Sequence, residues 1–386
     1  MSGAEPRRAT MPPACDVAVV GAGPAGAATA RHLARSGCRV TLLERSRFDT
    51  PRIGESLAPS VQPLLSALGV WARFLALRPL PSYGTRSVWG SATAAAHSHL
   101  ATPYLSGWHV DRQALDRMLA ESAAESGAQL LLGARVVGCQ PAANGGATLR
   151  VVDARDATRA FDLRADFVVD ATGRGSTMAR WLGARHALFD RLVAVAARFE
   201  DPDAGANCYT LVEATADGWW YAAPAGEGRT VAMLMTDGDL AGTLRLRMPG
   251  RWRAALRAAT ATSTRLRGAA LRRGPWIVSA VSQRLLRGPA GPMSLSVGDA
   301  ALSVDPISGS GVVRALRTAS AAARAAVAAL SGHSDAIASY EAERNEECTE
   351  YLIERAGYYD MERRWPGAPF WARRLAVVDR ARAGAA

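Results

Sequence analysis

Residues 16–35 read DVAVVGAGPAGAATARHLAR, and this stretch decides the fold. A short apolar run precedes a turn that contains Gly21, Gly23 and Gly26. The alanine-rich segment that follows favours a helix. Residues 38–44 (CRVTLLE) then supply a second buried strand. This order of strand, turn, helix and strand predicts a Rossmann βαβ unit.

The glycines have the spacing GxGxxG, and each has its own physical task. Gly21 permits a tight turn, Gly23 lets the backbone approach a pyrophosphate, and Gly26 allows the helix to pack closely on the strand. The start of the helix then faces the phosphates. Glu44, which ends the second strand, is expected to accept hydrogen bonds from the adenosine ribose and to repel a 2′-phosphate. These features favour FAD or NAD over NADP.

Composition limits the other classes of function. The 386 residues carry a net charge of +11, and all 46 basic residues are arginine. Genome composition explains such usage most simply, although a basic surface also favours an acidic partner or substrate. The arginines are not clustered among aromatic residues, so we expect no nucleic-acid partner. No apolar run has the length of a membrane span.

The ends of the chain and its cysteines bear on where the protein acts. Residues 1–13 are predicted to be a disordered leader. The five cysteines include no CxxC pair, which predicts neither a disulfide framework nor a metal site. We therefore expect a cytoplasmic, reducing setting.

Further along the chain, residues 54–71 have helical spacing, and residues 128–137, 160–165 and 167–170 have strand character. Strand-like stretches without intervening helices predict an antiparallel sheet as a second layer. They are residues 192–200, 208–212, 218–223 and 229–235. Residues 339–382 are rich in glutamate and arginine and are expected to be helical.

Two more segments favour FAD over NAD by resemblance. Residues 167–176 (FVVDATGRGS) resemble the ATG-type stretch of flavoprotein monooxygenases. Residues 296–316 (SVGDAALSVDPISGSGVVRAL) resemble the GD motif of the same family. The resemblance implies an α/β fold with a glutathione-reductase-like, FAD-binding Rossmann domain, an inserted antiparallel-sheet substrate domain and a helical C-terminal region.

The resemblance also implies roles for single residues. Asp299 is expected to bind the ribityl hydroxyls, and Pro306 to lie near the isoalloxazine. Gly309 and Gly311 would present N–H groups to the ring edge where reduced flavin carries negative charge. The full set expected to bind the cofactor is Gly21, Gly23, Pro24, Ala25, Gly26, Glu44, Arg45, Arg112, Asp170, Gly173, Asp299, Pro306, Gly309, Ser310 and Gly311.

On this basis we expect a discontinuous FAD-binding domain and a separate substrate domain. The FAD-binding domain would comprise residues 14–80, 108–180 and 290–335. The substrate domain would comprise residues 81–107 and 181–289, and the helical C-terminal region residues 336–386.

Residues 53–59 (IGESLAP) and 217–224 (DGWWYAAP) resemble the flavin-dependent tryptophan halogenase branch of the monooxygenases. In the WxWxIP signature of that branch, Tyr221 stands here for the second Trp and Ala223 for the Ile. Those halogenases use a lysine ammonium to hold hypohalous acid. This chain has no lysine, and arginine is a poor substitute because it is essentially never deprotonated. Halogenation is therefore disfavoured.

Residues 84–91 (GTRSVWGS) and 358–373 (YYDMERRWPGAPFWAR) are similar to flavoproteins that assist maturation of tryptophylquinone-containing amine oxidases and dehydrogenases. This resemblance implies a monooxygenase that hydroxylates an indole-like ring through a C4a-hydroperoxyflavin. The substrate would be a small aromatic molecule or a Trp of a partner polypeptide. Molecular oxygen would be the co-substrate, and NAD(P)H or a separate flavin reductase would reduce the FAD.

Within such a site we expect catalytic roles for Glu55, Ser56, Arg86 and His109. Stacking favours an aromatic wall for the substrate, formed by Trp89, Trp108, Trp219 and Tyr221. Two other functions stay open. One is an FAD-linked reductase of the geranylgeranyl-reductase type. The other is a non-catalytic flavin-binding maturation partner that docks through the arginine-rich C-terminal region.

Overall fold

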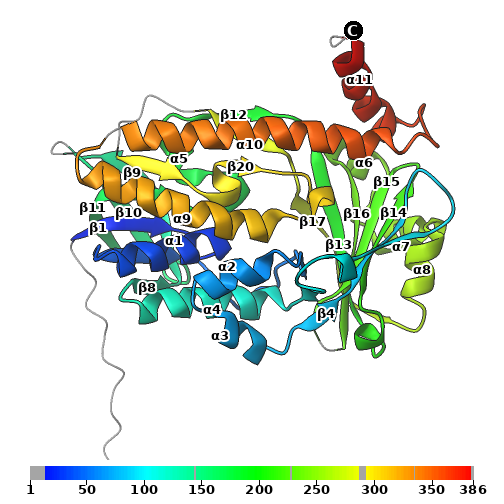
Figure 1. The fold of residues 1–386 in the computed structure, drawn as a ribbon, viewed down its shortest axis with the longest axis horizontal. Coiled ribbons are helices and arrows are strands. Elements are labelled where there is room, and N and C mark those ends of the chain that lie inside the picture. The colour runs from blue at the N-terminus through cyan, green and yellow to red at the C-terminus, as the bar shows by residue number, and fades with distance from the viewer. Residues whose placement is uncertain (1–13, 143–144, 227, 287–292, 334, 384–386) are drawn as a thin grey trace, which may run out of the picture.

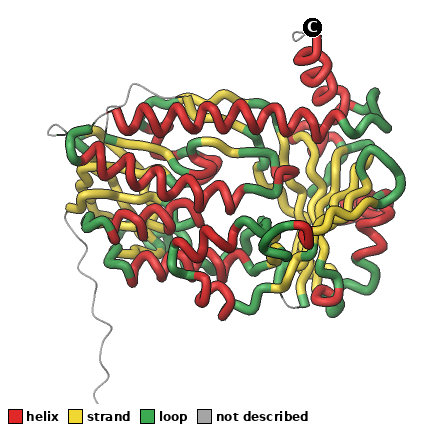
Figure 2. The backbone as a smooth tube through the Cα atoms, viewed as in Figure 1, coloured by secondary structure: helices red, strands yellow, loops and turns green. Residues whose placement is uncertain are grey.

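The computed structural model describes residues 14–142, 145–226, 228–286, 293–333 and 335–383. The predicted leader, residues 1–13, lies outside the described residues. Two large sheets lie side by side and two long helices run along them (Figures 1 and 2). No helix in the described ranges combines the length and hydropathy that a bilayer crossing needs.

The first sheet contains the Rossmann unit. Four of its strands are parallel neighbours, with β19 parallel to β11 as well, and two more extend it in antiparallel fashion. In spatial order the strands are β8 (Gln129–Leu132), β2 (Val40–Glu44), β1 (Ala14–Val20), β11 (Ala160–Asp170), β10 (Ala147–Asp153) and β9 (Ala134–Pro141), with β19 (Ser294–Ser296) beside β11.

Alanine-rich helices pack on this sheet. α1 (Pro24–Arg35) contacts both α4 (Arg112–Glu125) and α9 (Gly311–Leu330). The contact faces carry small, fully buried residues such as Ala27, Ala30 and Ala322, and small side chains let helix backbones approach closely. α10 (Asp335–Asp360) packs on α9 and runs across the top of the molecule toward the second sheet (Figure 1).

The second sheet has seven strands, all antiparallel except the pair of β14 with β5. In spatial order they are β17 (Ala270–Ser279), β13 (Leu192–Glu200), β16 (Arg229–Asp237), β15 (Gly218–Pro224), β14 (Tyr209–Thr215), β5 (Gly84–Val88) and β6 (Ala95–Ser98). One face packs on α7 (Pro249–Ala258) and α8 (Thr260–Arg265), where buried Trp252 donates to Val195 O at 3.0 Å.

The opposite face of the second sheet is covered in two ways. Toward one end the C-terminal helices cover it, because Trp371 of α11 (Pro369–Ala383) is fully buried and donates to Thr215 O at 2.8 Å. Toward the other end this face lies over a cavity that turns at the ends of the first sheet's strands also line.

The remaining elements are α2 (Val61–Ala67), α3 (Trp71–Ala76), α5 (Thr177–Trp181), α6 (Gly238–Thr243), the small sheet of β3 (Ser56–Leu57), β7 (Gly107–His109) and β4 (Leu80–Ser82), and the small sheet of β12 (Arg185–Leu188), β18 (Gln283–Leu286) and β20 (Leu302–Ser303).

The predicted fold class is confirmed, with a parallel Rossmann sheet, a largely antiparallel second sheet and C-terminal helices. The domain boundaries stay a prediction. One element was wrong: residues 54–71 do not form a single helix, because Ser56 and Leu57 pair with β7. Pro59 also prevents a continuous helix, since it lacks the N–H that the ladder needs. Residues 160–170 form one strand, where the sequence predicted two.

The glycine turn gives a test of the fold. A Cβ on Gly26 would lie 1.8 Å from Gly21 O, whereas a Cβ on Gly23 would meet nothing within 4 Å. We expect Gly26→Ala to lower the free energy of unfolding by roughly 3 kcal/mol, because the backbone around the turn must move. Gly23→Ala is the matched control, and urea unfolding measures both. Equal stability of the two variants would contradict the close approach.

Candidate active site

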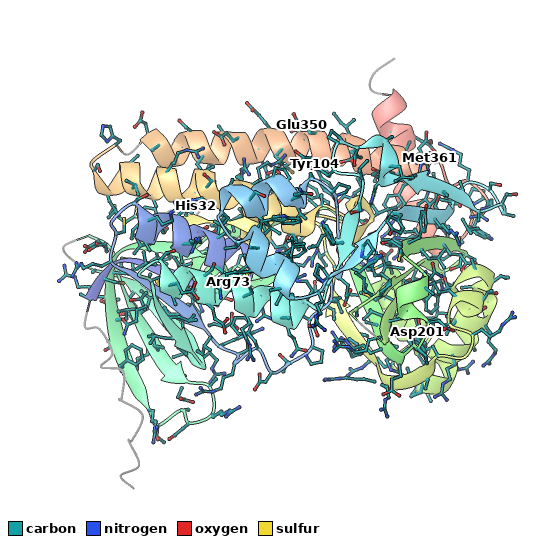
Figure 3. The ribbon with its side chains drawn as sticks, turned by 60° about the horizontal axis from the view of Figure 1, so that its bottom comes forward. His32, Arg73, Tyr104, Asp201, Glu350 and Met361 are labelled. Carbon is teal, nitrogen blue, oxygen red and sulfur yellow. The ribbon has the colours of Figure 1, made fainter. Side chains whose placement is uncertain are left out.

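A cavity of about 500 Å³ lies between the two sheets. Its floor comes from the turns that follow β1, β11 and β19 of the first sheet and from the helices α1, α4 and α9, and its roof from β15, β16 and β17 of the second. In Figure 3, His32 near the end of α1 and Asp201 just after β13 mark these two parts of the molecule. The glycine turn, the ATG-type turn and the segment around Asp299 all contribute lining residues. The structure thus brings together the three motifs that the sequence places far apart.

Glycines hold the turns together and leave room for a ligand. Gly21 has a φ of +104°, and a Cβ there would lie 2.3 Å from Ala171 O, so only glycine fits between the two turns. Gly173, Gly309 and Gly311 line the cavity, and a Cβ on any of them would meet nothing within 4 Å. The same holds for Gly23. A ligand can therefore approach the backbone at these positions.

Two helices begin at the cavity. α1 starts at Pro24 directly after Gly23, and α9 starts at Gly311 directly after Ser310. Neither start is capped by a side chain of the described residues. The first N–H groups of a helix carry partial positive charge and bind anionic groups. Both helix starts therefore offer donors to a negatively charged ligand.

Glu44 is buried beside the first turn and already has several protein partners. Its Oε2 accepts from Ala22 N at 2.9 Å, and its Oε1 accepts from Ser46 N at 3.0 Å and from Arg52 at 3.1 Å. This carboxylate fixes the end of β2 against the turn. Its contact with a ribose stays a prediction, as does a role for Arg45, which is exposed.

An ion-pair cluster borders the cavity beside this turn. Asp116 is fully buried and pairs with Arg52 at 2.6 Å and with Arg112 at 3.2 Å. Arg112 also donates to Ile53 O at 2.9 Å. The sequence predicted a binding role for Arg112, but for neither Arg52 nor Asp116. Arg112 and Asp116 are four residues apart in α4, and this i,i+4 spacing of opposite charges was the signal for Asp116.

The predicted residues of the ATG-type and GD motifs divide into two groups. Asp170 does not line the large cavity, because its carboxylate accepts from Thr172 N at 2.9 Å and Ala179 N at 2.8 Å and so fixes the turn itself. Asp299 does line the cavity, where it pairs with Arg174 at 3.5 Å. Pro306 also lies in the lining.

A cluster of hydroxyl groups lies under the roof. Ser56 and Tyr221 both line the cavity, and their oxygens are 2.8 Å apart. Ser56 Oγ is also 2.8 Å from Thr210 Oγ1 and 3.2 Å from Nδ1 of buried His109. Burial raises the pKa of Tyr221 well above its ordinary value, so its phenol stays protonated and neutral.

Glu55, next to Ser56, is fully buried. Its Oε2 accepts from Gly54 N at 2.8 Å, and its Oε1 has no hydrogen-bond partner among the described residues. Burial raises the pKa of this carboxyl, because desolvation disfavours the charged form. Glu55 does not line the cavity.

The predicted aromatic wall is only partly assembled at the cavity. Tyr221 lines it, but Trp89 and Trp219 pack with Tyr359 and Trp371 under the C-terminal helices. Trp108 instead packs edge-on against Trp71 and Phe74. Arg86 lies over the ring of Tyr209, away from the lining.

The wall contains residues that sequence reasoning missed. Met233 and Met235 of β16 and Trp276 and Val278 of β17 line the roof. The alternation along residues 229–235 was a signal for the methionines. β17 was not predicted at all, because Gly274 and Pro275 interrupt its apolar pattern. Buried Asp305 also lines the cavity, where it accepts from Tyr359 Oη at 2.7 Å.

Comparisons with known proteins agree with this geometry. The FAD binding domain family matches residues 14–354. The putative FAD-dependent oxidoreductase LodB of Marinomonas mediterranea is 30% identical over 364 residues, 94% of this chain and 97% of LodB.

Two solved structures share the architecture. The myxobacterial chondrochloren halogenase CndH has a TM-score of 0.85 and 23% identity, over 96% of this chain and 89% of its own. The peptidyl tryptophan dihydroxylase QhpG, essential for tryptophylquinone cofactor biogenesis, has a TM-score of 0.72 and 25% identity, over 94% of this chain and 78% of its own. The chain therefore belongs to the FAD-binding-domain family and is an FAD-dependent oxidoreductase.

Proposed function

We propose that this oxidoreductase is a monooxygenase that hydroxylates an aromatic ring, namely a tryptophan side chain of a partner polypeptide. The observation that carries the proposal is the two-sided cavity. One side presents glycine backbone and two helix starts, and the other presents Tyr221, Met233 and Trp276. A flavin and an indole ring would lie against each other in such a space. The likeness to QhpG, a peptidyl tryptophan dihydroxylase, supports the choice of substrate.

The residues present fit FAD. The start of α1 at Pro24 would bind the pyrophosphate, and the start of α9 at Gly311 would lie at the anionic edge of the isoalloxazine. Asp299 would accept from the ribityl hydroxyls. When bound and reduced, FAD supplies two electrons and the activation of molecular oxygen. NAD(P)H, directly or through a separate flavin reductase, would replace those electrons.

The chemistry defines what the protein groups must do. One oxygen atom replaces a ring hydrogen as a hydroxyl group, and the other leaves as water with the two electrons and two protons. The apolar roof would hold the ring and exclude bulk water. The hydroxyl groups of Tyr221 and Ser56 are 2.8 Å apart. They would share a hydrogen-bonded proton beside the ring and could donate or accept a proton there. Halogenation is disfavoured because the sequence offers no lysine.

His109 is not suited to act as a base in this scheme. Burial lowers its pKa from 6.5 to about 3, so the imidazole is neutral at the pH of the cell. Its Nδ1 lies 3.2 Å from Ser56 Oγ. We assign it the role of orienting the Ser56 hydroxyl.

The proposed function gives three predictions, and the first of these concerns cofactor binding. Gly23→Ala places a methyl group in open space at the start of α1, where the pyrophosphate would approach. We expect its FAD affinity to fall by at least about tenfold, because the methyl group would keep the pyrophosphate from the backbone N–H donors and hydrogen bonds would be lost. Fluorescence titration of apoprotein with FAD measures the affinity. Gly205→Ala is the matched control, because a Cβ there also meets nothing within 4 Å and lies outside the cavity lining. Unchanged affinity in Gly23→Ala would argue against the assigned pyrophosphate position.

The second prediction concerns the reaction. FAD-loaded protein is reduced anaerobically and then mixed with ¹⁸O₂ and a tryptophan-containing peptide. We expect mass spectrometry to find ¹⁸O in the indole ring of the product. Hydrogen peroxide as the sole product with all indole and phenol donors would refute the monooxygenase. Reduction of an alkene substrate without oxygen incorporation would instead favour the geranylgeranyl-reductase type of enzyme.

The third prediction uses the titration of His109. The unfolded chain binds a proton near pH 6.5, and the buried ring does so only near pH 3. The native state therefore loses stability as the pH falls from 6.5 toward 3, by up to about 1.4 kcal/mol per pH unit. His109→Gln should remove this part of the acid sensitivity, measured by urea unfolding at pH 7 and at lower pH. His97→Gln, at an exposed histidine of β6, should keep it. Parallel profiles for all three proteins would contradict the burial of a neutral imidazole.

A further inference from the structure

β17 lies at the edge of the second sheet. On one side it pairs with β13, and no strand in the described ranges pairs with its other side. Ile277 and Ser279 are exposed, and Ile277 has 40% of its surface accessible. An unpaired edge presents a row of backbone N–H and C=O groups to which another chain can add a strand.

The hydrogen-bond pattern shows which groups point outward. Ala280 N donates to Leu192 O at 3.0 Å, so Ala280 has its N–H directed toward β13. In an antiparallel pair these directions alternate residue by residue. Val278 and Trp276 therefore also bond β13, while the N–H and C=O groups of Ile277 and Ser279 point to the free edge. Pro275 has no N–H, which limits pairing to the stretch after it.

The same stretch forms part of the active-site roof. Trp276 and Val278 line the cavity and are only half-buried. Side chains of neighbouring strands on one face of a sheet lie about 5 Å apart. A strand added beside β17 would therefore place alternate side chains next to Trp276 and Val278, on the cavity side of the sheet.

Positive charge next to this edge favours a partner with acidic residues. Arg273, three residues before Trp276, lies over the Trp276 ring at 5.7 Å and is in register with Arg198 of β13. Neither guanidinium makes an ion pair with an acid of the described residues. Arg198 donates instead to the carbonyl of Arg52, which lines the cavity. An acidic group near Arg273 would relieve this concentration of positive charge.

We propose that β17 binds the substrate polypeptide by strand addition, as an extended acidic segment. Its residues pair with Ile277 and Ser279, and its aromatic side chain enters the cavity beside Trp276. β13 spans two residues, Ala196 to Arg198, where β17 spans three, Trp276 to Arg273. An acidic residue two positions from the aromatic one, on the same face of the added strand, therefore faces Arg273, at a spacing of roughly 7 Å. The inference deepens the proposed function and rests on it for the identity of the aromatic side chain.

The test measures binding without turnover. The probe is a fluorescein-labelled synthetic peptide with a single tryptophan, one glutamate two positions before it, one glutamate two positions after it and threonines elsewhere, so that either strand direction places an acid near Arg273. Anisotropy is recorded with oxidised, FAD-loaded protein. We expect Ile277→Pro, which removes an outward N–H and leaves the bonds to β13, to weaken binding by about tenfold. Ile277→Ala keeps that N–H and is the matched control.

Two altered peptides separate strand addition from other contacts. N-methylation of alternate backbone amides removes the donors of one strand edge, and glutamine in place of glutamate removes the charge. We expect both changes to weaken binding, the second only at low salt. Equal binding of the methylated and unmethylated peptides, or no binding at all, overturns the proposal. A dimer of the protein alone that Ile277→Pro dissociates would assign the edge to a second copy and overturn it as well.

The binding experiment and the ¹⁸O experiment can fail independently of each other. Peptide that binds through β17 but gains no ¹⁸O would leave the docking edge in place and remove the monooxygenase. Peptide hydroxylated equally well by wild type and Ile277→Pro would leave the monooxygenase in place and remove the docking edge.

Discussion

The structure depends on the contact between two turns, at Gly21 and Ala171. A Cβ on Gly21 would lie 2.3 Å from Ala171 O, so the ends of β1 and β11 meet only because glycine occupies this position. That contact fixes where α1 begins. β19 pairs with β11 and leads to the GD segment, which places the start of α9 at the same cavity. Two helix starts that meet at one cavity offer an anion site made of backbone N–H groups, beside the arginines that also line the cavity.

The second sheet adds what the first lacks, a wall of apolar side chains. Because side chains alternate along a strand, the sheet can pack on α7 and α8 with one face and roof the cavity with the other. Small residues on β13, Ala194 and Ala196, face the same way as Met233 and Trp276. They leave space beneath the strand next to the edge, and the cavity extends as far as β17.

Local patterns predicted the backbone of the site better than its walls. Gly23, Gly309, Gly311 and Asp299 were expected at the site from spacing and resemblance alone, and they line the cavity. Trp219 and Tyr221 show the limit, because they alternate onto the same face of β15. Trp219 is covered by Tyr359 and Trp371 from the C-terminal helices, whereas Tyr221 faces the cavity. The periodicity of a strand shows which residues share a face. It does not show which part of that face another segment covers, because that depends on contacts between residues far apart in sequence.

The charged groups around the cavity suit the binding of a ligand, and other groups are needed for proton transfer. Its cations are arginines, and Arg52, Arg112 and Arg174 each pair with an acid. A guanidinium holds a fixed charge and essentially never exchanges its proton, so these groups suit the binding of an anionic cofactor. Protons must move through other groups. In the proposed reaction the candidates near the roof are the hydroxyl groups of Ser56 and Tyr221, with His109 Nδ1 at 3.2 Å from Ser56 Oγ. A neutral hydroxyl can pass a proton on without retaining charge beside the proposed substrate ring.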